Sequence, residues 1–396
     1  MPEMPHDELA LRRERFSAEA APLNVDGIAL FHSHNVGYLS GFAFVPTERP
    51  IAYVEAADGS CVLVVPELEG EHAATAGGVE RVVTYDEFPG DRHPMELIRD
   101  VVHDLGLDGP GRRVGVDHNG YPPVLGYWGP PLSELIGSEL VPLSRTLDRV
   151  MMVKSSYELD LLRMSSDWAA RAHELLQAYT AVGVTETEVA QRASSDATME
   201  LARAVPGYSG GGNGSGARAG YRGQIGRHGA LPHSLGESIR FEAGDTLVTG
   251  ATAPMWGYVS ELERTMFMGP PSDEQRRLFG HVLRLQDIGF DAIRAGEPAS
   301  GADEAVRAYF EQEGLWDYWR HHVGHGIGRR YHEAPFLDRG DHTILEPGMV
   351  LTVEPGLYDP DWGGFRHSDT VVVEDNGIEI ITAAYPRDLE SLVIPL

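Results

Sequence analysis

Three glutamates lie in sequence patterns that could gather negative charge in one place. Glu261 and Glu263 are two residues apart in the segment SELERT, and Glu354 ends the apolar run of TVEPG. Residues two apart in a strand face the same side, about 7 Å from each other. Two carboxylates on one face repel each other unless water or a cation lies between them. The pattern indicates either a cation-binding pocket or a solvent-facing acidic strand edge.

Histidines that could transfer protons occur in two segments. His325 and His332 belong to HHVGHGIGRRYHEAP at 321–335, where glycines permit close approach of the backbone. His233 follows a glycine-rich stretch at 208–233. That stretch lacks the Gly-Lys-Ser/Thr ending of a phosphate-binding loop, so we interpret it as a loop that leads to His233.

The first part of the chain alternates short apolar runs with a helical pattern. PMELIRDVVHDLG at 94–106 has helical spacing and stops at a glycine. The apolar runs that read as strands are 27–31, 51–56, 61–65, 81–85 and 113–117. This order predicts an α/β domain over residues 1–150.

The second part begins with helices and continues with strands. Three capping boxes predict helix starts, at Ser155 with Glu158, Thr185 with Glu188, and Ser272 with Gln275. From residue 244 onward, strand-like runs end in FRHSDTVVVEDNG. Helices packed on a curved antiparallel sheet fit this order, which predicts an α+β domain over residues 151–396.

The composition excludes some partners. Sixty acidic residues against thirty-two basic ones give a formal net charge of −28, and acids outnumber bases in both parts of the chain. Such a surface disfavours nucleic acid and anionic membranes. Cys61 is the only cysteine, which excludes an internal disulfide, and the polar N-terminal segment lacks the apolar stretch of a signal peptide. We expect a cytoplasmic protein.

Five motifs follow one another in the C-terminal part: LPH, GY-x-S-x-x-x-RT, GHGIG-x-x-x-HE-x-P, VEPG and FRHSDT. Their order resembles the pita-bread fold hydrolases, which include methionine aminopeptidase, aminopeptidase P, prolidase and creatinase. HNVGYLSGF at 34–42 resembles the N-terminal domain of the aminopeptidase P and creatinase branch. The resemblance implies a creatinase-like N-terminal domain at 1–150 and a pita-bread catalytic domain at 151–396.

The resemblance also implies a metal site that has lost ligands. Peptidases of this superfamily hold two divalent ions with two aspartates, a histidine and two glutamates. Three of these positions fall on residues that can still bind a metal: Glu261, His325 and Glu354. The other two fall on residues without a carboxylate: Gly250 (or Thr249 after a one-residue shift) and Ser368. A complete two-metal centre is therefore not expected.

Creatinase, which resembles the peptidases in fold but works without metal, provides a second comparison. The residues that correspond to its catalytic and substrate-binding groups are His233, Glu263, Glu354 and His325. Its N-terminal domain sends an arginine into the site of the partner subunit, and ERP places Arg49 there. The sequence departs from creatinase at Glu261 and Ser368, and His332 follows the peptidase pattern.

We therefore expect a homodimeric, metal-independent hydrolase that cleaves a C–N bond in a small cationic molecule and needs no cofactor. His233 would move the proton. The expected catalytic residues are His233, Glu263, Glu354, His325 and His332. The expected substrate-binding residues are Arg49, Glu261 and His367.

Two alternatives stay open. The first is a metal-dependent Xaa-Pro dipeptidase or aminopeptidase that binds one divalent ion, such as Mn or Zn, through Glu261, His325 and Glu354. The second is a pita-bread protein that binds peptides without catalysis. Metal content and a panel of substrates would separate the three hypotheses.

Overall fold

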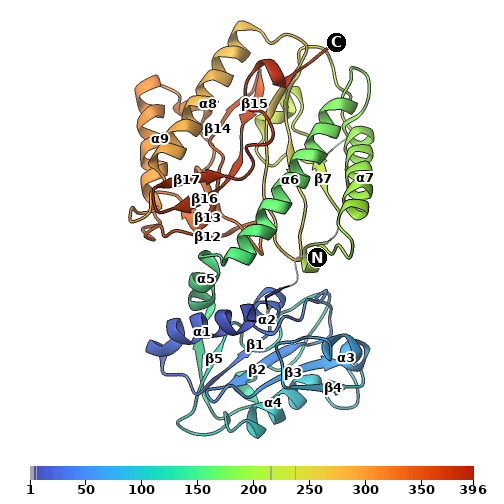
Figure 1. The fold of residues 1–396 in the computed structure, drawn as a ribbon, viewed down its shortest axis with the longest axis vertical. Helices are drawn as coiled ribbons and strands as arrows, with labels where there is room; N and C mark the ends of the chain where they lie inside the picture. The colour runs from blue at the N-terminus through green and yellow to red at the C-terminus, as the bar shows by residue number, and fades with distance from the viewer. Residues whose placement is uncertain (1–3, 6, 215, 237) are drawn as a thin grey trace. The chain divides into compact units, whose positions relative to one another are not determined.

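The computed structural model describes residues 4–5, 7–214, 216–236 and 238–396 (Figure 1). The chain divides into two compact units, one up to Met151 and one from Met152 to Leu396. Among the described residues, no helix is both long and apolar enough to cross a membrane.

The N-terminal unit is a six-stranded mixed sheet with helices on both faces. The strand order is β4-β3-β2-β1-β5-β6. β1 pairs antiparallel with β2 and parallel with β5. The strands are β1 (Gly27–Leu30), β2 (Ala52–Ala56), β3 (Cys61–Pro66), β4 (Arg81–Tyr85), β5 (Arg113–Val116) and β6 (Glu139–Pro142). The helices are α1 (Glu8–Ala20), α2 (Ser33–Ser40), α3 (Glu67–Ala73), α4 (Pro94–Asp104) and α5 (Ser144–Met152). The predicted strands and the predicted helix are confirmed.

The alternation of apolar side chains along the strands divides the core of this unit into two layers. Leu30 and Leu63 pack with Phe16 of α1 on one face of the sheet. On the other face, Val62 and Val64 share a cluster with the apolar side of α4. Both faces of these strands are covered, which explains why they read as continuous apolar runs.

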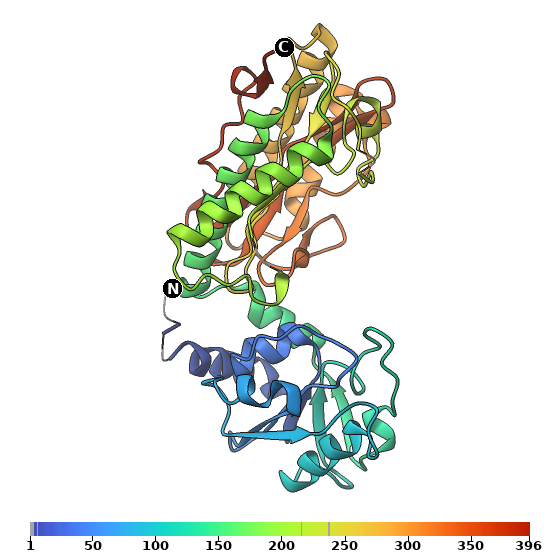
Figure 2. The same ribbon diagram turned by 90° about the vertical axis from the view of Figure 1, so that its right-hand side faces the viewer.

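The C-terminal unit places four long helices around short strands. The helices are α6 (Ser156–Tyr179), α7 (Glu186–Ala204), α8 (Asp273–Ala292) and α9 (Ser300–Glu313). The predicted capping boxes at Ser155, Thr185 and Ser272 are all formed, which explains where α6, α7 and α8 begin. Figure 1 shows α6 and α7 on one side of the strands and α8 and α9 on the other, and Figure 2 shows α6 and α7 side by side.

The largest sheet of this unit is antiparallel and has the order β12-β11-β13-β16-β17. Its strands are β11 (Gly324–Gly326), β12 (Glu333–Leu337), β13 (Val350–Val353), β16 (Asp369–Glu374) and β17 (Gly377–Ile380). The remaining strands form smaller sheets: β7 (Arg218–Gly220) with β9 (Gly250–Thr252), β14 (Gly356–Asp359) with β15 (Gly363–Arg366), and β8 (Thr246–Val248), β10 (Thr265–Met268) and β18 (Val393–Ile394). The predicted α/β domain followed by an α+β domain with antiparallel sheets is confirmed.

A buried ion pair fixes the start of the C-terminal unit. Lys154, the only lysine of the chain, lies between α5 and α6 with its Nζ 3.1 Å from Oε2 of Glu333 at the start of β12. Both side chains are almost completely buried. Burial opposes charge on Glu333, but the charges and hydrogen bonds of Lys154 and Arg330 together outweigh it and lower the pKa of Glu333. Removing either partner would leave a buried charge without its counterion.

Candidate functional site

Strand pairing brings together three side chains that are far apart in the sequence. His325 lies in β11, and β11 pairs with β13, at the end of which Glu354 follows. The backbone N–H of Glu354 donates to the carbonyl of Val323 over 2.7 Å. Glu261 lies in the extended segment before β10, where its N–H donates to Oγ1 of Thr370 in β16 over 2.9 Å. Contacts with neighbouring strands therefore hold the backbone in place at all three residues.

Glu261, His325 and Glu354 form a cluster with the dimensions of a metal site. One ligand atom from each residue lies within 4.8 Å of the other two. Nε2 of His325 is 3.1 Å from Oε1 of Glu354. Nδ1 of His325 donates to the carbonyl of Gly326 over 3.0 Å, so Nε2 is the nitrogen directed at the carboxylates. Ser368 donates its hydroxyl to Oε1 of Glu261 over 2.8 Å. Groups of this kind orient metal ligands in proteins.

The charges of the cluster are not balanced. Burial, together with the charges of Glu354 and Glu263, raises the pKa of Glu261 to about 8. Burial disfavours charge on Glu354 as well, but the hydrogen bond and charge of His325 outweigh it and lower the pKa of Glu354 to about 2. Burial also opposes protonation of His325, yet Glu354 and Glu261 raise the pKa of its imidazole to about 9. At neutral pH the cluster binds protons that a cation would displace.

Glu263 is held by two arginines and does not face the substrate space as a free carboxylate. Both its side chain and that of Arg366 are only 4% exposed. Arg366 donates from Nε to Oε2 of Glu263 and from Nη2 to Oε1 over 2.9 Å. Arg222 donates to the same Oε1 over 2.8 Å. Because two guanidinium groups already balance this carboxylate, the reason for expecting Glu263 to attract a cationic substrate disappears.

His332 and His233 lie on the exposed side of the cluster. The ring of His332 stacks on that of His325 with a centroid distance of 3.9 Å. Partial burial and the charge of His325 lower the pKa of His332, so its ring is neutral at pH 7. His233 is exposed, and its charge is among those that act on His332. The structure thus places His332 on the cluster, and His233 is close enough to His332 for its charge to act there.

The structure does not bring His367, another predicted substrate-binding residue, to this cluster. His367 is fully buried, and its ring contacts Phe279 of α8 with a centroid distance of 5.2 Å. Arg366 and Ser368 face the cluster, so the intervening side chain of an extended segment points the other way. Arg49 lies in the N-terminal unit and pairs with Glu48 and Glu87. The role of Arg49 in the site of a partner subunit stays a prediction.

The positions that were expected to lack metal-binding carboxylates are occupied in other ways. A Cβ added to Gly250 would lie 3.4 Å from Oε1 of Glu263, so the Glu263 carboxylate fills the space beside this glycine. Thr249 is buried and bonded to the backbone of Arg264. Ser368 supports Glu261 through its hydroxyl. At each position where a metal-binding carboxylate is missing, the structure therefore shows what the residue present does instead.

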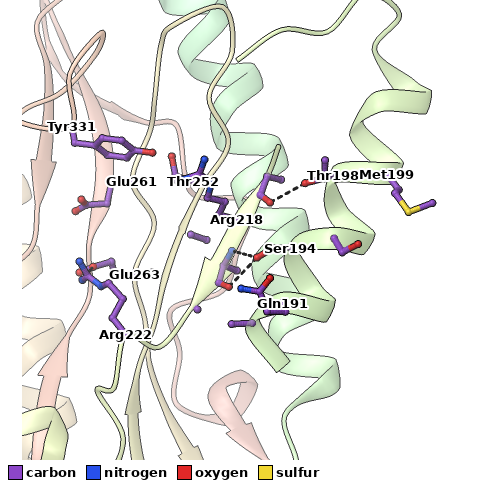
Figure 3. Close-up of a pocket in the computed structure, with 17 residues that line it drawn as sticks. Gln191, Ser194, Thr198, Met199, Arg218, Arg222, Thr252, Glu261, Glu263 and Tyr331 are labelled. Atoms are coloured by element: carbon purple, nitrogen blue, oxygen red, sulfur yellow. Dashed lines mark hydrogen bonds and ion pairs between the residues drawn. The ribbon is translucent and has the colours of Figure 1, made fainter. Parts of the chain in front are cut away.

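A cavity of about 670 Å³ opens beside the cluster (Figure 3). Glu261 and Glu263 line one wall, with Arg222 beside Glu263, and Arg218 lies across the cavity from Glu261. Tyr331 and several residues of α7 complete the lining. The segment 208–233 is not only the loop that the sequence predicts, because it contains β7 and supplies Arg218 and Arg222 to this cavity. Only the density of arginines in GARAGYRGQ could have pointed to them.

Comparison with known proteins identifies the family. The model of "Metallopeptidase family M24" matches residues 160–375, and that of the "Creatinase/Prolidase N-terminal domain" matches residues 12–153. The first match covers more than half of the chain, which therefore belongs to metallopeptidase family M24 and is a hydrolase.

Relatives with similarity along their whole length carry peptidase names. The chain is 29% identical to the "Probable dipeptidase PepE" of Mycobacterium bovis, over 98% of both chains. It is 28% identical to an "Xaa-Pro dipeptidase" of Pyrococcus horikoshii, over 91% of this chain and 93% of the relative. The solved structure of an "Xaa-Pro dipeptidase from Bacillus anthracis" is 26% identical, with a TM-score of 0.80 over 98% of this chain and 100% of that one. The resemblance to the pita-bread hydrolases is confirmed.

The expectation of an enzyme without a cofactor is wrong. The family that matches the C-terminal unit is a family of metallopeptidases, and this chain gathers a Glu-His-Glu cluster within the matched residues. The loss of two carboxylates suggested a metal-free site, but that reasoning treated a reduced ligand set as an absent one. Three protein ligands are sufficient for catalytic metal sites, which keep an open position.

Proposed function

We propose that this chain is a metal-dependent peptidase that hydrolyses Xaa-Pro dipeptides or similarly small peptides, using one divalent ion held by Glu261, His325 and Glu354. The observation that carries the proposal is the 4.8 Å cluster of ligand atoms from two carboxylates and an imidazole. The peptidase names of the relatives support the substrate class.

The residues of the cluster fit a divalent ion chemically. Two carboxylates and a neutral imidazole nitrogen suit Mn or Zn. The raised pKa of Glu261 reflects a pocket in which negative charges repel each other, and a cation would relieve that repulsion. The hydroxyl of Ser368 and the carbonyl of Gly326 already orient Glu261 and His325. The ligands are thus held before any ion arrives.

A divalent ion bound here would supply Lewis acidity at the scissile carbonyl group. The residues of the chain do the rest. His332 is neutral at pH 7 and can donate a hydrogen bond or accept a proton beside the cluster. His233 is exposed near His332 and can pass protons to and from water. We propose His332 and His233 as the acid–base residues, and Arg366 as the group that holds Glu263 away from the reacting atoms.

Metal removal tests the proposal directly. Purified protein should contain about one equivalent of a divalent transition metal by elemental analysis, in line with three ligands. A chelator should abolish hydrolysis of Ala-Pro, and added Mn or Zn should restore it. Hydrolysis that survives complete metal removal, or the absence of hydrolysis of any dipeptide by metal-loaded protein, would contradict the proposal.

Metal affinity should depend on pH. In the metal-free protein the pKa values of Glu261 and His325 are about 8 and about 9, so both bind protons at pH 7. A metal ion has to displace these protons, so the apparent affinity should rise by about tenfold per pH unit for each proton released, up to pH 8. Titration calorimetry in buffers of different ionisation enthalpy measures the metal affinity and the number of protons released. An affinity that stays constant from pH 6 to pH 8 would show that no proton is displaced.

A further inference from the structure

The cavity beside Glu261 contains the guanidinium group of Arg218, which forms no ion pair with any residue that the structure describes. Arg222 pairs with Glu263, but among the residues that the structure describes, no carboxylate lies within ion-pair distance of Arg218. Arg218 is also exposed to the solvent of the cavity. Its guanidinium packs over Gly214, where a Cβ would lie only 2.6 Å from Nη2. The chain thus keeps a cation in the cavity, and the described residues supply no carboxylate as its counterion.

The backbone around Arg218 is fixed, so the point from which its side chain extends is defined. β7 pairs with β9, and Arg218 lies opposite Thr252. The neighbours of Arg218 in β7 are tied to α7: Ser194 bonds both the N–H and the carbonyl of Ala219, and Thr198 donates to the carbonyl of Ala217 over 3.2 Å (Figure 3). A side chain anchored on a rigid strand loses less freedom when it binds a ligand.

A second polar group beside Arg218 also lacks a partner. Oγ1 of Thr252 is buried without a hydrogen-bond partner in the part of the chain that the structure describes, and Thr252 lines the same cavity. Opposite residues in an antiparallel pair project to the same face of the sheet. An unsatisfied buried hydroxyl is costly and is expected to find its partner in a ligand or ordered water. Arg218 and Thr252 together offer hydrogen-bond donors to an anion.

We infer that this cavity is a substrate subsite that binds a carboxylate group through Arg218 and Thr252, across from the carboxylates of Glu261 and Glu263. This inference rests on the proposed peptidase function. Guanidinium groups bind carboxylates with two parallel hydrogen bonds, which gives directional as well as charge selectivity. The carboxylate has two possible sources in a small peptide, namely an acidic side chain of its first residue or its C-terminus.

Four peptides distinguish the sources. Glu-Pro and Gln-Pro differ only in the side-chain charge, and Ala-Pro and Ala-Pro amide differ only at the C-terminus. For the preferred carboxylate, Arg218→Met should lower kcat/KM about 10- to 100-fold while leaving the uncharged counterpart within about twofold. Arg203→Met is the matched control, because Arg203 is an exposed arginine at the end of α7 that does not line the cavity.

Binding of the same peptides to chelated, metal-free protein separates this inference from the peptidase function. Calorimetry should show that Arg218→Met weakens binding of the peptide with the preferred carboxylate by about 10- to 100-fold, as for kcat/KM. Arg203→Met should leave this binding unchanged. The subsite is overturned if wild type and Arg218→Met bind each of the four peptides equally well and hydrolyse each of them with equal kcat/KM. If no peptide is hydrolysed but the binding difference persists, the subsite stands and the proposed peptidase function fails.

Discussion

Replacing Glu354 with glutamine is expected to lower kcat/KM for Ala-Pro by more than about 100-fold and to weaken metal binding. The loss of a group that merely supports a ligand costs about 10- to 100-fold, and Glu354 is proposed as a ligand itself. Its carboxylate is ionised above about pH 4, because His325 and Arg366 outweigh burial and lower its pKa to about 2. The amide keeps the shape of the side chain but removes the charge that would bind the ion.

The fold should survive this change. Without Glu354 the pKa of His325 falls and its ring becomes neutral, so no buried charge is left without a partner. Circular dichroism and a thermal melt check this point, and metal content by elemental analysis gives a readout besides turnover. Glu346→Gln is the control, since Glu346 is an exposed glutamate just before β13. Full metal content and near-normal turnover in Glu354→Gln would remove Glu354 from the ligand set.

Replacing Glu263 with glutamine is expected to destabilise the C-terminal unit by about 3–5 kcal/mol, the range measured when one partner of a buried ion pair is removed. Arg366 is 4% exposed and has its main counterion in Glu263, while Oε2 of Glu354 is 3.9 Å away from its Nε. A neutral amide would leave that guanidinium undercompensated in a buried place. Urea denaturation followed by fluorescence would measure the change in the free energy of unfolding.

The same carboxylate provides an internal comparison. Arg222 also pairs with Glu263, but its side chain is 54% exposed. Arg222→Gln should therefore cost no more than about 1 kcal/mol, as exposed ion pairs do. A Glu263→Gln variant of unchanged stability that raises KM only for cationic substrates would mean that Glu263 binds substrate, which would reverse our interpretation of this residue.

Local patterns were sufficient to predict the starts of three long helices and the main strands of the N-terminal sheet, but not short elements such as β7. The capping boxes at Ser155, Thr185 and Ser272 depend on contacts three residues apart, so the sequence contains all the information needed to place the starts of α6, α7 and α8. The continuous apolar runs of β1–β3 follow from helices on both faces of one sheet. Glu261, His325 and Glu354 could be grouped in advance only because ordered motifs resembled a known superfamily.

Long-range pairing explains what the sequence did not reveal. The ion pair between Glu263 and Arg366 joins residues 103 positions apart, and no local pattern contains it. Without that partner, Glu263 looked like a free carboxylate, and the pocket looked more negative than it is. His367 is a different case, because strict alternation in FRHSDT already puts it on the face opposite Arg366 and Ser368. Applying that alternation would have excluded it from the site.

The burial of Lys154 has a consequence for the outer surface of the protein. Because the one lysine of the chain is enclosed with Glu333, every other basic side chain apart from histidine is an arginine. Guanidinium groups keep their proton far above the range in which lysine ammonium groups lose theirs. The solvent-facing basic side chains other than histidine are therefore guanidinium groups, and acetyl-transferring or amine-coupling reagents should find no lysine side chain in contact with solvent.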